Sequence, residues 1–195
     1  MKISVVVILI AAVCTSISLQ PSSASTSRRT VDNLQWGQPS DGVQVSLSST
    51  DSNGSSLQVA FRNVGDHDVT LNLGSMMANG KVQLPNDINI NFTDAQGWTR
   101  VFKFGDKKHS FVAGRLDDYV VPLRVGSMYT LKLALDQFWC HESKEFEIRL
   151  LPGKNRLTAQ FHGNGARLVN LDMPAIKLMN FWLGSVESNT LTIER

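Results

Sequence analysis

The stretch LQVAFRNVGDHDVTLNL, residues 57–73, decides the fold class. Apolar residues occupy every second position in 57–61 and again in 69–73. This period of two places the apolar side chains on one face of a strand and the polar side chains on the other. Between the runs, residues 63–68 have the composition of a turn, because Gly accepts positive φ and Asn and Asp hydrogen-bond to their own backbone. The stretch therefore predicts a hairpin of two antiparallel strands, each with one face on a core.

The same alternation recurs along the rest of the chain. Strand patterns follow one another from Trp36 onward at the roughly 8–12-residue spacing typical of sandwiches and barrels. Further strands are expected at 43–47, 88–92, 98–104, 119–123, 129–135, 146–150, 157–161 and 191–193. Pro122 places its strand at an edge or a bulge, and residues 76–85 are expected to form a longer connection. The chain has no segment with a sustained helical period, so we expect an all-β protein, an antiparallel β-sandwich of about eight to ten strands.

Residues 152–193 contain a characteristic succession of turns and strands. Pro152-Gly153 precedes RLTAQF at 156–161, FWLG follows at 181–184, and SNTLTI occupies 188–193. This pattern resembles the final two strands of immunoglobulin-like modules in extracellular proteins. The resemblance implies an immunoglobulin-like sandwich and carries over no active site, because such modules serve binding, spacing and adhesion alike. The chain departs from antibody domains in lacking the cysteine pair and in having Asn155 where a tyrosine corner would be expected.

The first 24 residues have the pattern of a signal peptide. Lys2 precedes an unbroken apolar run at 3–13, which is too short to span a bilayer but suits a signal-peptide core. Small residues follow, and we expect cleavage after Ala24. Residues 25–33 are Ser-rich and are expected to form a flexible leader, which leaves 34–195 as a single β-sandwich domain. We therefore expect a secreted protein, extracellular or periplasmic in a bacterium, with no membrane insertion after cleavage.

The charge and the cysteine content limit the classes of partner and the kinds of catalytic chemistry to be considered. The formal net charge is +2 and the charges are interspersed, so nothing recommends a nucleic acid as partner. Removal of the signal peptide leaves Cys140 as the single cysteine. Its neighbours Phe138 and Trp139 favour a buried free thiol, while pairing with another chain and a role as nucleophile are the alternatives.

Candidate catalytic and metal-binding residues are scattered. The four histidines lack the spacing of a common metal site, and Asp66-His67-Asp68 is expected at a solvated hairpin tip. Asp117 and Asp118 point to opposite faces of a strand and do not converge on one substrate, although either of them could contribute to a calcium site. The chain contains no phosphate-binding loop, nucleophile elbow or zinc signature. We expect no catalytic residues, no metal and no cofactor.

Two kinds of surface feature remain. Asn53-Gly54-Ser55 and Asn91-Phe92-Thr93 are N-glycosylation sequons if the source is eukaryotic. The longest irregular stretch, 163–180, is too apolar for disorder and precedes two aromatic residues. It is expected either to fold over an open end of the core or to offer a contact surface. The candidate contact residues are Leu168, Met173, Phe181 and Trp182.

Together these features favour a secreted, non-enzymatic binding module that contacts a protein or glycan through its loops. One rival hypothesis is a hydrolase that uses loop carboxylates or Cys140. The other is an inhibitor of secreted proteases that presents the loops 76–81, 105–115 and 163–180.

The first prediction concerns processing. We expect the mature protein to begin between residues 17 and 26 and to be soluble, because small residues follow the apolar run there. N-terminal sequencing of the secreted product checks this. Protein that retains Met1 and stays with the membrane would contradict it.

Overall fold

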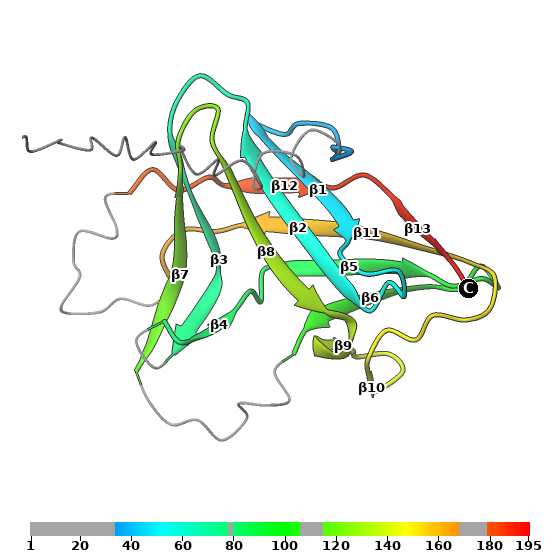
Figure 1. Ribbon diagram of the computed structural model, residues 1–195. Coiled ribbons are helices and arrows are strands. Elements are labelled where there is room, and N and C mark those ends of the chain that lie inside the picture. The colour runs from blue at the N-terminus through cyan, green and yellow to red at the C-terminus, as the bar shows by residue number, and fades with distance from the viewer. Residues whose placement is uncertain (1–33, 78–79, 106–114, 168–178) are drawn as a thin grey trace, which may run out of the picture. The chain divides into compact units, whose positions relative to one another are not determined.

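The computed structural model describes residues 34–77, 80–105, 115–167 and 179–195, and every structural statement below concerns these residues. They form thirteen strands and one short 3-10 turn, η1 (Figure 1). In chain order the elements are β1 (Val43–Ser49), β2 (Ser56–Asn63), β3 (Val69–Met77), β4 (Val82–Leu84), β5 (Ile88–Thr93), β6 (Thr99–Phe104), β7 (Leu116–Leu123), β8 (Met128–Ala134), η1 (Leu135–Gln137), β9 (Phe138–Cys140), β10 (Glu145–Phe146), β11 (Lys154–Gly163), β12 (Gly184–Glu187) and β13 (Leu191–Glu194). The predicted all-β class is confirmed. The strands outnumber the expected eight to ten because short ones such as β4, β9 and β10 are too brief to show an alternation.

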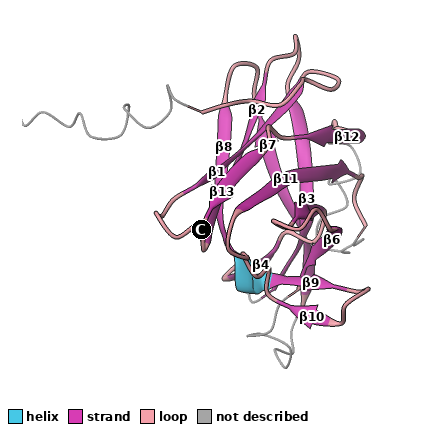
Figure 2. Cartoon of the chain, turned by 90° about the vertical axis from the view of Figure 1, so that its right-hand side faces the viewer, coloured by secondary structure: helices cyan, strands magenta, loops and turns pink. Residues whose placement is uncertain are grey.

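The strands form three antiparallel sheets. Sheet A has the order β1-β2-β8, and sheet B has the order β4-β3-β7. Sheet C has the order β10-β9-β6-β5-β11, and β12 and β13 share the remaining edge of β11. Sheet A crosses in front of β5, β6 and β11 in Figure 1, and η1 lies beside β9 and β10 at the lower end of Figure 2. The protein is therefore an antiparallel β-sandwich, as the alternation predicted.

The core lies between the facing sheets and is rich in aromatic side chains. The ring of Phe61 on β2 meets Phe161 on β11 edge to face, with the ring centroids 5.2 Å apart. Phe161 in turn stacks on Trp182 at 5.5 Å. Such aromatic pairs add roughly 0.5–1.5 kcal/mol each beyond the area that they bury. These contacts join sheet A, sheet C and the segment before β12 into one core.

The hairpin predicted for residues 57–73 is wrong. β2 pairs with β1 and β8 in sheet A, whereas β3 pairs with β4 and β7 in sheet B. The turn at 64–68 carries the chain from one sheet into the other. Alternation identified both strands correctly, but it reports which face of a strand is buried and not which strand lies beside it.

Two further segments differ from expectation. The strand predicted for 146–150 ends at Phe146, because Glu147 adopts a left-handed backbone conformation with φ of 82° that breaks the extended chain. Within the connection predicted for 76–85, β3 instead continues to Met77 and pairs with β4, and Gly80 has a positive φ of 81°. Pro122 does lie in an edge strand, since β7 pairs only with β3 in the described part of the chain.

The clearest alternation of the sequence, at 129–135, forms β8, but its two central leucines differ in burial. Leu133 is 4% exposed and belongs to the core. Leu131 is only partly buried and packs against the margin of the core. The alternation places both on the same inward face and so predicts that both are almost fully buried. The expectation fails at Leu131, which lies beside an open hollow and keeps part of its surface exposed, whereas Leu133 lines the same hollow but is covered.

This difference gives the second prediction. Leu133→Ala should lower the free energy of unfolding by about 2–5 kcal/mol, because it leaves a cavity in packed surroundings. Leu131→Ala serves as the matched control and should cost less, roughly 1–2 kcal/mol, because its side chain already contacts water. Denaturant unfolding of both variants measures the two costs. Equal costs would show that the two leucines share one environment.

Candidate functional site

One end of the sandwich carries a set of turns that hydrogen bonds tie together. We call it the rim and define it as residues 40–42, 64–68, 124–127 and 179–183. The turns after β2 and after β7 lie side by side at the top of Figure 1. Asn63 joins them, because its backbone N–H donates to Ser127 O at 3.1 Å and its carbonyl accepts from Gly126 N–H at 2.9 Å. Its position thus fixes two turns at once.

The side chain of Asn63 is buried and makes three further hydrogen bonds. Its amide donates to His67 O at 2.9 Å and to Leu123 O at 3.0 Å. Its side-chain oxygen accepts from Gly65 N–H at 2.9 Å. A buried amide that satisfies all these partners holds the turn in one conformation, since losing any of them leaves a desolvated polar group.

A close glycine contact brings the first rim turn against the second. The backbone N–H groups of Val64 and Gly65 both donate to Gly42 O, at 2.7 and 3.1 Å. Gly42 has a φ of 79°, and a Cβ there would lie 2.8 Å from Gly65 Cα. Only glycine fits this approach.

Residues 179–183 complete the rim by pairing with β3. Thr70 N–H donates to Asn180 O at 2.7 Å, and Trp182 N–H donates to Thr70 O at 2.9 Å. The indole N–H of Trp182 also reaches Asp41 O at 3.1 Å. Trp182 is only 4% exposed, so it anchors the segment in the core and leaves the surface to its neighbours. Phe181 is partly exposed, and Leu168 and Met173 lie outside the described residues.

The rim presents apolar side chains to the solvent. In the described part of the chain, seven large apolar side chains are exposed, and four of them belong to the rim. These are Val64, Val125, Met179 and Leu183, with exposed fractions of 48%, 49%, 38% and 64%. A backbone hydrogen bond joins Asn63 to Gly126. Val64 follows Asn63 and Val125 precedes Gly126, so Val64 and Val125 occupy adjacent positions. Single exposed apolar residues are ordinary, but such a concentration on fixed turns is typical of an interaction site.

Charged rim residues serve mainly to hold the turns or remain in water. Asp68 accepts from Val125 N–H at 2.8 Å, and its own carbonyl accepts from the Asn180 amide at 3.0 Å. Asp66 and His67 form an exposed contact of 2.7 Å. The His67 side chain lowers the pKa of the Asp66 carboxyl by hydrogen bonding to it. The Asp66-His67-Asp68 tip, which was expected to be solvated, is therefore a turn anchor with one solvated pair.

A second polar cluster anchors residues 164–167. Asp118 is 2% exposed and accepts from the Asn72 amide at 2.9 Å and from Arg167 N–H at 3.1 Å. The Arg167 guanidinium donates to Asp87 at 2.7 Å. Burial raises the pKa of Asp87 despite the opposing effect of Arg167. These contacts join sheet B to the segment after β11 and to the residue before β5, and they occupy the Asp118 oxygens that a calcium ion would need.

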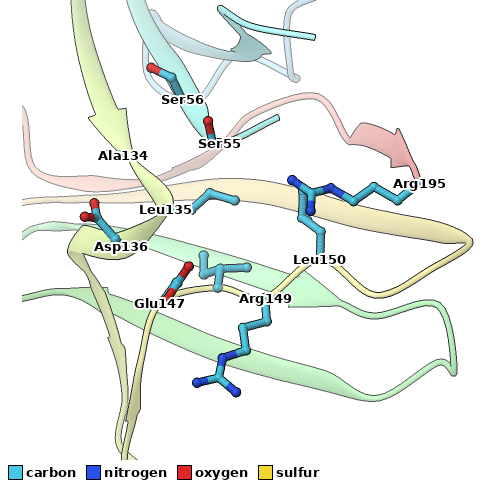
Figure 3. Close-up of a pocket in the computed structure, with 10 residues that line it drawn as sticks. Ser55, Ser56, Ala134, Leu135, Asp136, Glu147, Arg149, Leu150 and Arg195 are labelled. Atoms are coloured by element: carbon cyan, nitrogen blue, oxygen red, sulfur yellow. The ribbon is translucent and has the colours of Figure 1, made fainter. Parts of the chain in front are cut away.

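An open groove of about 580 Å³ lies near the opposite end of the sandwich (Figure 3). Asp136 and Glu147 line it on the side of η1, and Arg195 reaches in from the end of β13, while the Arg149 guanidinium points away. Both carboxylate residues are exposed. The groove holds no His or Cys among its lining residues, so a hydrolytic site there would rest on these two carboxylates alone.

The other residues that the sequence singled out are dispersed. Cys140 is a free thiol with no exposed surface, on β9, while its neighbour His141 is exposed. Asn53 lies in the exposed β1–β2 turn, and Asn91 lies on the outer face of sheet C, where it alternates with buried Ile90 and Phe92. Among the described residues, no three or more His, Cys, Asp and Glu side chains are grouped to hold a metal ion. Nor does any helix in the described segments have the length and apolar character needed to cross a bilayer.

The comparisons with known proteins return no relative. No protein-family model, no curated protein and no solved structure matches the chain. The function must therefore be argued from the site.

Sequence reasoning missed Asn63, although the sequence contains a clue to it. Asn63 continues the inward-facing series of 57, 59 and 61, so the period that buries those residues buries a polar amide as well. A buried amide must find partners. Which carbonyl groups it bonds to depends on how the β7–β8 turn returns to Asn63, and only the tertiary structure decides that.

The third prediction tests the role of Asn63. Asn63→Asp should cost about 4 kcal/mol at neutral pH, because a carboxylate would face two carbonyl oxygens in a buried site. The cost should shrink in acid, where the protonated carboxyl regains one donor. Asn53→Asp, in an exposed turn, is the matched control and should change stability little. Chemical denaturation of both variants at two pH values measures this, and a small loss for Asn63→Asp would contradict the role.

Proposed function

We propose that the protein is a secreted immunoglobulin-like binding module that contacts a protein partner through its rim. The observation that carries the proposal is the combination of hydrogen-bonded turns with four exposed apolar side chains. Turns that are already fixed lose little conformational entropy on binding. Apolar side chains that such turns hold at the surface provide the desolvated centre that protein interfaces need.

The chemistry of the rim favours a protein over a glycan. A sugar ring is held by an exposed aromatic face together with hydrogen-bonding groups. At the rim Trp182 is buried, Phe181 is only partly exposed, and the Asn63 amide is committed to the turns. The large apolar side chains that the rim exposes are all non-aromatic, which suits the apolar side chains of another protein.

One local feature supports the likeness to immunoglobulin modules. Where a tyrosine corner would be expected, Asn155 is fully buried. Its amide donates to Leu151 O at 2.7 Å and to Gly153 O at 3.1 Å, and its oxygen accepts from Leu151 N–H at 3.1 Å. Asn155 therefore fastens the turn before β11 as a tyrosine hydroxyl fastens the corner in those modules.

The rival functions have weaker support. The Cys140 thiol has no access to a substrate in this conformation, and the groove carboxylates Asp136 and Glu147 are exposed to water. Of the loops considered for protease inhibition, 76–81 begins within β3, which pairs with β4. The other two lie mostly outside the described residues.

The fourth prediction tests the rim. When this protein is used as bait, the variant with Val64→Asp and Val125→Asp should recover at least tenfold less of the partner than wild type, because charge would enter the apolar contact. The matched control is Leu116→Asp, a residue 43% exposed at the other end of β7. Quantitative mass spectrometry of proteins recovered from the native secretion compares wild type, rim variant and control. Equal recovery by all three baits, each shown to be folded, would contradict the proposal.

A further inference from the structure

The two edges of sheet A differ in how the chain treats their backbone groups. At the β1 edge the outward-facing groups are occupied. Val43 exchanges two hydrogen bonds with Ser40, and Gly37 N–H donates to Val45 O, all at 2.9 Å. The Asn189 side chain accepts from Leu47 N–H at 2.8 Å and donates to Leu47 O at 3.0 Å. The β1 edge is thus closed along most of its length, as edge strands usually are.

The β8 edge is open in its middle. In an antiparallel ladder, successive residues direct their backbone groups to opposite sides. Leu135 N–H donates to Ser55 O on the β2 side, so odd-numbered residues of β8 face β2 and even-numbered residues face outward. Gln137 caps the outward N–H of Ala134 at 2.9 Å. For Thr130 and Lys132, no partner strand lies on the outward side within the described residues.

A hollow adjoins this open edge. Its volume is about 70 Å³, and Pro85, Phe104 and Tyr119 line it opposite Leu131 and Leu133. Tyr119 donates to Gln83 at 2.9 Å, and its hydroxyl also meets that of Tyr129 on β8. Because β7 and β8 separate beyond this contact, Leu131 on the inner face remains only partly buried. The hollow therefore lies directly beside the backbone N–H and C=O groups that have no partner strand among the described residues.

We propose that the β8 edge accepts an extended segment of a partner protein as an additional strand of sheet A. The backbone of that segment would pair with the N–H and C=O groups of Thr130 and Lys132. Alternate side chains of a strand point to one face, so an apolar side chain of the segment would enter the hollow against Leu131. The exposed ammonium of Lys132 favours a carboxylate near it on the other face.

The surroundings of the edge fit a single strand better than a second copy of this chain. Tyr119 of sheet B and Pro85, which follows β4, line the hollow beside β8, so the space next to it is bounded. A second folded copy would have to bring its own sheet B to the same place. The β8 edge is also separate from the rim, so this proposal does not depend on the rim contact.

Hydrogen exchange of the free protein tests whether the edge is open. We expect the amide protons of Thr130 and Lys132 to exchange at least tenfold faster than those of Leu131 and Leu133, which bond to β2. Slow exchange at all four positions in a monomer would mean that the chain closes its own edge. Slow exchange that accompanies dimer formation in ultracentrifugation would make a second copy the occupant. Either result overturns the proposal.

Selection from a phage-displayed library of random nine-residue peptides tests the partner chemistry. We expect enrichment of peptides with alternating apolar residues, and binding at least tenfold weaker to Thr130→Pro, which removes an outward N–H. Proline is tolerated on edge strands when its nitrogen faces outward, as Pro122 shows in β7. Thr130→Ala keeps the N–H and should bind as wild type. Lys132→Pro with Lys132→Ala repeats the comparison if Thr130→Pro does not fold.

The outcomes separate backbone pairing from other contacts. Equal loss in the proline and alanine variants would assign binding to the side chains and overturn strand addition. Strand addition is also overturned if no peptide is enriched on the wild type over the proline variant. Protection of the Thr130 and Lys132 amides by the enriched peptide would support it.

Discussion

The arrangement depends on the hydrogen bonds that converge on Asn63. At this residue the chain leaves sheet A for sheet B, and at the same level β7 returns to β8. The backbone and the side chain of Asn63 form hydrogen bonds to both turns, and these bonds fix the position of sheet A relative to sheet B. Because the amide is buried, these bonds are either all made or costly to lose. The same hydrogen bonds therefore also hold the turns of the rim in place.

Three other asparagines, the buried Asn72 and Asn155 and the partly buried Asn189, have similar roles elsewhere in the sandwich. Asn72 donates to Asp118 and to Gly165 O, Asn155 fastens the turn before β11, and Asn189 closes the edge of β1 at Leu47. An amide side chain offers a donor and an acceptor side by side, as a peptide group does, so it can pair with backbone that has no neighbouring strand. The Cys140 thiol is free. In the described part of the chain, such asparagine side chains hold turns and edges that disulfides hold in many small domains.

Backbone hydrogen bonding also distinguishes the surfaces that stabilise the fold from the surfaces that can bind a partner. At the rim, hydrogen bonds occupy the polar groups and leave aliphatic side chains outside. At β8 the reverse holds, because side chains partly fill a hollow while no strand of the described residues lies beside the backbone of Thr130 and Lys132. The two places therefore favour different modes of contact, one through side chains and one through backbone pairing.

The sequence by itself determined the class of the protein and the inward face of its main strands, because side-chain alternation follows directly from strand geometry. It also marked most turns, through the φ preferences of Gly and the backbone bonding of Asn and Asp. Only the tertiary structure decided that β2 and β3 belong to different sheets, that Leu131 faces a hollow, that Trp182 lies in the core and that Asn63 joins two turns. The physical reason is that burial and pairing depend on neighbours brought from far along the chain, whereas alternation describes one strand at a time.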